Sequence, residues 1–311
     1  MCIRDSYKAP NPDYGATFTY FLKSGLTDSK KKSRTTAEKK LAKNNQDVPF
    51  PGWDALDEEK NEEKSGVYLV IKDATGKIMN KVKGSANKGI NRKSWNLQIA
   101  SSDPIALDAK PSQQGFFGGG GYKVTPGTYT MTLVKVDGGK DTILDGPKEF
   151  EVKPLLEPTI QGASHDEIIA FREEFQAFKN DLAETNAKLS KAKKYSSALM
   201  TAYERANEQP SALLEDIYAY RNEVRTIDRK MNGYSSKREV GEKDNPTPGD
   251  ANLLGWVALG GTYGPTGNHK KALQRAKGQL AELSGELDNV VDSIDTLKSQ
   301  LKAVGAPLIQ E

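Results

Sequence analysis

The sequence predicts an α+β protein of two domains, an antiparallel β-sandwich followed by an elongated antiparallel helical bundle or coiled-coil hairpin. Two periodicities carry this prediction. Apolar side chains recur at every second residue between residues 14 and 155, whereas after residue 164 they recur at every third or fourth. The length of 311 residues suits about two ordinary domains. Hydrophobic residues make up only 36% of the chain, which favours small cores and solvent-bathed helices over a large enzyme core.

The first six residues, MCIRDS, stand apart from both predicted domains. They contain neither a periodic pattern nor the apolar stretch of a signal peptide. Such a start is typical of a translated adapter remnant in a reading frame from a metagenomic assembly. We therefore expect residues 1–6 to be an artefact, the sandwich to span residues 7–158 and the helical domain to span residues 159–311.

The first strand is expected within YGATFTYFLK, residues 14–23, because Phe18, Tyr20 and Leu22 fall on one side of an extended chain. A polar stretch over about residues 24–64 follows. It has almost no apolar periodicity, so it is interpreted as an insertion in the sandwich, partly helical around Thr36–Lys43 and anchored by the segment PFPGW.

Two hairpins and one further strand complete the sandwich. The first hairpin covers residues 66–84 around a turn at Asp73–Gly76. The strand GINRKSWNLQI follows, with Trp95 as its core anchor, and leads into a loop rich in glycine, serine and proline at residues 100–121.

The second hairpin turns at Val136–Lys140 and places Tyr129, Met131 and Leu133 on one face. Short strands joined by glycine turns, with no helical period between them, favour a sandwich of the immunoglobulin or fibronectin type III kind.

Three helices are expected in the second domain, at about residues 165–207, 210–232 and 267–304. Ser164 and Glu167 form a capping-box pattern at the start of the first helix. The last helix has the strongest heptad in the chain, with leucine or isoleucine at positions 273, 280, 287, 294 and 301. Residues 232–267 are predicted to be irregular.

Charge and composition exclude several classes of function. The net charge of +3 is nearly balanced, which gives no reason to expect a nucleic-acid partner. No apolar run approaches the roughly 20 residues of a membrane span. The single cysteine, Cys2, excludes an internal disulfide and a thiolate zinc cluster. The four glycines Gly118–Gly121 run into a predicted strand rather than a helix, so they do not form a phosphate loop, and no cofactor is expected.

No catalytic or metal site is expected either. His165 and His269 lie far apart without ligand partners at helical spacing, so both are expected to face solvent. The carboxylates between Asp57 and Glu63 alternate with lysine and lack apolar walls, so they are interpreted as a solvated run rather than acid/base machinery. The lysines of residues 30–43 lack interleaved aromatics and are interpreted in the same way.

Aromatic residues are the remaining candidates for binding. Trp53 is either a buried plug that pins the insertion or a platform for stacking a sugar, and its apolar neighbours favour the plug. An exposed row of Trp53, Phe116, Phe117 and Tyr122 would be a carbohydrate or partner contact. Trp256 is expected in a loop, packed across the end of the bundle.

The order of several segments resembles a known family. PNPDYGATFTYFLK, PFPGWDAL, VYLVIKDATGKIMNKVKG, GINRKSWNL and VTPGTYTMTL, closed by VGAPLIQE, are similar to the C-terminal region of bacterial sortilin-like (VPS10-related) β-propeller proteins with BNR repeats, which are often labelled glycosyl hydrolases. The resemblance implies a propeller upstream of this region and an extracytoplasmic location. No Asp-box of the type S-x-D-x-G-x-T-W occurs here, so no catalytic residue carries over.

The expected function is therefore that of a non-catalytic C-terminal accessory region. Its sandwich would support the propeller or dock a partner, and its helices would mediate contacts within the protein or self-association. The alternative is a carbohydrate-binding module of a glycoside hydrolase. A hydrolase would require paired carboxylates in a cleft of this chain. Whether the parent protein is an enzyme stays open.

Overall fold

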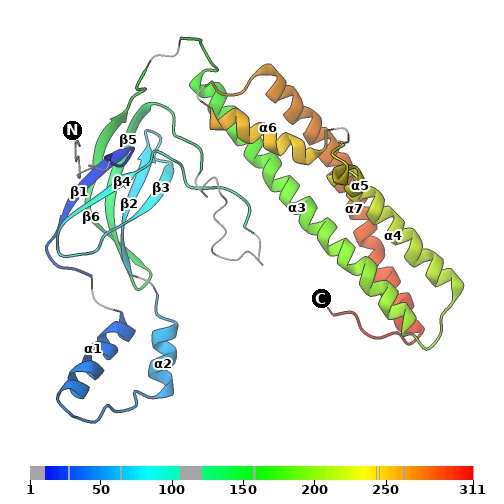
Figure 1. The fold of residues 1–311 in the computed structure, drawn as a ribbon, viewed down its shortest axis with the longest axis horizontal. Coiled ribbons are helices and arrows are strands. Elements are labelled where there is room, and N and C mark those ends of the chain that lie inside the picture. Colours follow the sequence, from blue (N-terminus) through cyan, green and yellow to red (C-terminus); the bar gives the residue numbers. More distant parts are fainter. Residues whose placement is uncertain are drawn as a thin grey trace, which may run out of the picture. The chain divides into compact units, whose positions relative to one another are not determined.

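The chain divides into two compact units in a computed structural model (Figure 1). The structure describes residues 11–26, 29–63, 65–105, 121–156, 159–242, 244, 246–261 and 263–310. Unit 1 comprises Met1–Ser101 and Gln114–Glu157, and unit 2 comprises Ser102–Gln113 and Pro158–Glu311. Unit 1 contains two small antiparallel sheets, whereas unit 2 is helical. The predicted α+β class is confirmed.

Unit 1 contains a four-stranded sheet in the order β3-β2-β5-β6 and a two-stranded sheet of β1 and β4. Their bounds are Ala16–Leu22 for β1, Gly66–Asp73 for β2, Ile78–Gly84 for β3, Gly89–Trp95 for β4, Gly127–Asp137 for β5 and Lys140–Val152 for β6. Both predicted hairpins are confirmed, since β2 pairs with β3 and β5 pairs with β6 in antiparallel register.

The two sheets share one apolar interior. Tyr20 and Leu22 of β1 contact Val67 and Leu69 of β2, as their alternation along each strand requires. Trp95, at the end of β4, is only 1% exposed, so its predicted role as a core anchor is confirmed. Its indole nitrogen donates a 2.8 Å hydrogen bond to the Gln98 carbonyl. The buried ring therefore leaves no polar atom unpaired.

Two helices form the insertion between β1 and β2. The first, α1 at Lys30–Lys43, includes the predicted segment but begins six residues earlier, where the Ser29 side chain accepts from the Lys32 amide. The second, α2 at Trp53–Lys60, was not predicted. Neither helix contains a buried residue, which explains why hydrophobic periodicity did not reveal them.

Unit 2 is built on three mutually contacting helices, α3 at His165–Glu204, α4 at Ser211–Asn232 and α7 at Gly267–Ala303. Their predicted existence and bounds are confirmed to within three residues. The Ser164 hydroxyl accepts from the Glu167 amide and the Glu167 carboxylate accepts from the Ser164 amide, which completes the predicted capping box. The α7 heptad is buried within the chain itself, at Leu273, Leu280, Leu287, Ile294 and Leu301.

The predicted irregular segment 232–267 contains two helices, α5 at Ser235–Glu239 and α6 at Pro248–Gly260. The prediction failed for α6 because its sequence is apolar on all sides and interrupted by glycine, so it shows no amphipathic period. Trp256 lies on this helix, 47% exposed, rather than in a loop packed across the bundle end. The helix packs against α3 and α7.

Gly255 allows this close packing. A methyl group at its position would lie 2.2 Å from the Phe175 ring of α3. By contrast, Gly278 and Gly285 of α7 face open space. The three glycines are all helical, so they differ only in what surrounds them.

We therefore expect glycine-to-alanine substitutions at these positions to change the free energy of unfolding in opposite directions. Gly255→Ala should lower the free energy of unfolding by about 1–3 kcal/mol, because the Phe175 ring must shift in a packed core. Gly278→Ala and Gly285→Ala should each raise it by about 0.5–1 kcal/mol, because alanine loses less conformational entropy in a helix. Urea unfolding followed by circular dichroism measures both. Equal effects at Gly255 and Gly278 would contradict the packing of α6 on Phe175.

Candidate functional site

The insertion of α1 and α2 is held together by ion pairs. The Lys30 ammonium lies 2.7 Å from a Glu58 carboxylate oxygen, and the Lys30 amide donates to Glu62. Arg34 binds Glu59 with two nitrogens, at 2.6 and 3.0 Å, in the two-pronged geometry that a guanidinium favours. Because neither helix buries an apolar residue, these contacts fix how α2 lies against α1.

The acidic run at residues 57–63 therefore has a structural role. Glu59 was expected to be solvated, but its side chain is only 9% exposed and is paired with Arg34. The hydrogen bond from Arg34 lowers the pKa of Glu59, and the hydrogen bond from Lys30 lowers the pKa of Glu58. A general acid at neutral pH needs a raised carboxyl pKa, so these two carboxylates are unsuited to acid catalysis.

An apolar group that we call the aromatic tip lies at the connection between α1 and α2. It consists of Val48, Phe50 and Trp53, which are 46%, 61% and 78% exposed. The rings of Phe50 and Trp53 meet edge to face, with centroids 5.0 Å apart. Gly52, at a φ of 89°, turns the chain into α2 so that Trp53 is the first helical residue.

The prediction that Trp53 is a buried plug is wrong, because its side chain is exposed in the aromatic tip. The apolar neighbours Pro49, Phe50 and Pro51 pointed to burial, but Phe50 packs on Trp53 locally and both rings stay exposed. Large exposed aromatics cost free energy in isolation and are typical of contact surfaces. The structure thus shows Trp53 as a surface residue rather than a core residue.

The other predicted contact residues do not join Trp53 in a described row. Phe116 and Phe117 lie outside the residues that the structure describes. Tyr122 is half-buried, and its carbonyl accepts a 2.9 Å hydrogen bond from the Ile99 amide beside an isolated bridge between Gln98 and Lys123. Tyr122 thus belongs to the backbone pairing that precedes β5, whereas Trp53 lies on the helical insertion.

The histidines have no metal partners in the described part of the chain, where no group of three His, Cys, Asp or Glu side chains could hold an ion. His165 is exposed, as expected. His269 is half-buried, and its Nδ1 accepts a 3.1 Å hydrogen bond from the Thr266 amide at the start of α7. The Thr-x-x-His spacing could have revealed this capping role, because it matches a capping box with histidine in place of glutamate.

We expect the Arg34–Glu59 pair to control the order of the insertion. Arg34→Ala should speed chymotrypsin cleavage after Trp53 and Leu56 severalfold, because α2 loses its two-pronged anchor. Lys39→Ala removes an exposed charge of α1 that has no hydrogen bond or ion pair with a described residue of α2, so it should leave the cleavage rate unchanged. Mass spectrometry of timed digests gives both rates. Identical rates in the two variants would show that the pair does not order α2.

Comparisons with known proteins do not assign this site. No family model matches the chain, and no curated protein or solved structure is significantly similar to it. Among the described helices, none is long and apolar enough to cross a membrane. The function is therefore argued from the residues themselves.

Proposed function

We propose that this chain is a non-catalytic C-terminal accessory and interaction region of a larger, exported, sortilin-like β-propeller protein. The aromatic tip is the observation that carries the interaction role. Trp53 and Phe50 are exposed on an ion-paired helical hairpin, which presents a preformed apolar contact. Tryptophan is enriched among the residues that dominate binding energy at protein interfaces.

The partner that we propose is the upstream propeller of the same protein. The order of the segments from PNPDYGATFTYFLK to VGAPLIQE supports this assignment, because it resembles the region that follows such propellers. The same resemblance supports a location outside the cytoplasm, in the periplasm, at the cell surface or in the medium.

We further propose that unit 1 is a small sandwich of the immunoglobulin or fibronectin type III kind. The shared apolar interior of its two antiparallel sheets supports this proposal. The arrangement of two strands against four is smaller than the seven strands usual for such domains.

A carbohydrate-binding module is the second candidate. The exposure of Trp53 favours it, since a sugar ring could stack on the indole. Its neighbour is less favourable, because Phe50 meets Trp53 at an interplanar angle of 68° and the two rings do not form one flat platform. Binding on a glycan array that is lost in Trp53→Ala would favour this candidate over a protein contact.

The genomic sequence upstream of residue 7 tests the proposed context. We expect an open reading frame that continues upstream through BNR-type propeller repeats to a signal peptide. A stop codon directly upstream, or a frame without propeller repeats, would rule out the proposed parent protein.

Binding to that upstream region tests the aromatic tip. With the two parts expressed separately, Trp53→Ala should weaken binding at least about tenfold, as expected for a buried tryptophan anchor. Phe21→Ala is the matched control, since Phe21 is also an exposed aromatic residue of unit 1 but lies on β1. Titration calorimetry measures both. An equal loss in both variants would argue against a contact centred on Trp53.

A further inference from the structure

A cationic hollow lies in unit 2 between α3, α4 and α5, independent of the aromatic tip. It has a volume of about 550 Å³ and is lined by Lys193 of α3, Arg225 and Arg229 of α4, and Arg238 of α5. Asp228 is its one carboxylate, so the lining has an excess of three positive charges. That excess equals the net charge of the whole chain, which is +3.

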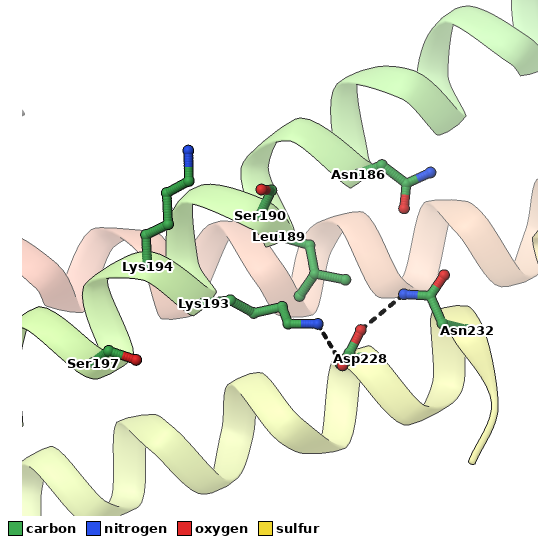
Figure 2. A pocket seen from close by; sticks show the side chains of 8 residues that line it. All are labelled: Asn186, Leu189, Ser190, Lys193, Lys194, Ser197, Asp228 and Asn232. Carbon is green, nitrogen blue, oxygen red and sulfur yellow. Dashed lines mark hydrogen bonds and ion pairs between the residues drawn. The ribbon is translucent and has the colours of Figure 1, made fainter. Parts of the chain in front are cut away.

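The carboxylate of this hollow is already engaged. One oxygen of Asp228 accepts from the Lys193 ammonium at 2.8 Å, and the other accepts from the Asn232 amide at 2.8 Å (Figure 2). Burial alone would raise the pKa of Asp228, but these hydrogen bonds offset it and the pKa lies below its usual value. Asp228 therefore stays ionised, and its strongest contacts are with Lys193 and Asn232 rather than with the arginines.

Among the residues that the structure describes, no carboxylate lies within ion-pair distance of the three arginines, although the charge of Arg238 helps to lower the pKa of Asp228. Arg225 and Arg229 are four residues apart, so they share one face of α4. The Arg229 guanidinium carbon lies 5.3 Å from the centre of the Tyr234 ring, a cation–π contact that involves no hydrogen-bond acceptor. Elsewhere in unit 2, cations meet carboxylates of a neighbouring helix, as in Lys188–Asp288, Lys230–Glu286, Lys270–Glu167 and Lys277–Glu174.

We propose that this hollow binds a phosphoryl oxyanion, a phosphomonoester or inorganic phosphate. Guanidinium groups bind phosphate oxygens through paired N–H donors, and a tetrahedral anion accepts from several such groups at once. A monocarboxylate would neutralise only one of the three excess charges. The volume lies within the range of small-ligand sites, so the hollow has room for the group that carries the phosphate.

A second hollow, of about 490 Å³, adjoins the first and shares Lys193, Asp228 and Asn232 with it. Figure 2 shows this part between α3 and α4, where Ser190, Ser197 and Asn186 add uncharged polar groups and Lys194 adds a further cation. Hydroxyl and amide groups bind polar parts of a ligand without adding charge. They suit the neutral part of a phosphorylated molecule.

Calorimetric titration of the full chain at low ionic strength tests the site. Inorganic phosphate and glucose 6-phosphate should bind saturably with a Kd below about 1 mM, and acetate should bind at least tenfold more weakly. Tighter binding of the ester would indicate that the attached group is recognised, whereas equal affinity would indicate free phosphate as the ligand. Absence of saturable binding of both phosphates would overturn the proposal.

Variants locate the binding. Arg225→Ala and Arg238→Ala should each weaken phosphate binding at least tenfold, and Arg225→Lys should recover only part of the loss because lysine lacks the paired donors. Arg275→Ala is the matched control, since Arg275 is an exposed arginine of α7 outside the hollow. Equal weakening of phosphate binding in Arg275→Ala would show that the loss of any positive charge has this effect, and it would overturn the proposed site.

Nuclear magnetic resonance spectra of the unmodified protein give an independent measurement of phosphate binding. On titration with phosphate, the Nε–Hε resonances of Arg225, Arg229 and Arg238 should shift together and saturate with the calorimetric Kd. Shifts spread evenly over all arginines, or none at these three, would contradict the assignment even if a variant failed to fold.

Discussion

The limited supply of apolar side chains is the constraint on which the rest of this structure depends. Hydrophobic residues make up 36% of the chain, so each unit buries only a limited set of apolar side chains. Unit 1 relies on strand alternation around Trp95, and unit 2 relies on heptad positions such as Leu287 and Ile217, both fully buried. Because burial of apolar area is the main stabilising term, these buried positions hold each unit together. Trp53 is one of several large apolar side chains that stay exposed, and its ring is paired with that of Phe50.

Polar contacts shape the regions where apolar burial is absent. In the insertion, Arg34 and Lys30 of α1 meet carboxylates of α2 that match them in number and geometry. In the hollow between α3, α4 and α5, the arginines outnumber the one carboxylate, Asp228. The same ion-pair chemistry therefore has two outcomes. Matched charges hold a helix in place, whereas unmatched charges leave donors for a ligand.

Prediction from the sequence succeeded where a periodic pattern existed. It failed where local packing determines whether a segment is helical or a side chain is buried. The helices α3, α4 and α7 and both hairpins follow from spacing, because each buries one regular stripe. The helix α6 lacked such a stripe, and its packing against α3 and α7 includes the close approach of Gly255 to Phe175. Trp53 was misjudged because Phe50, an apolar neighbour in sequence that suggested burial, packs on it at the surface.

The sequence by itself determined the two classes of secondary structure, their order and the core side chains of the periodic strands and helices, because periodicity is a property of neighbours along the chain. Only the tertiary structure decided which charges meet. Glu59 could have paired with any of several lysines, and the arginines at positions 225 and 238 could have met carboxylates. The partner of Glu59 lies on another helix, and no described carboxylate lies within ion-pair distance of either arginine, so both outcomes depend on distances in space that no spacing in the sequence encodes.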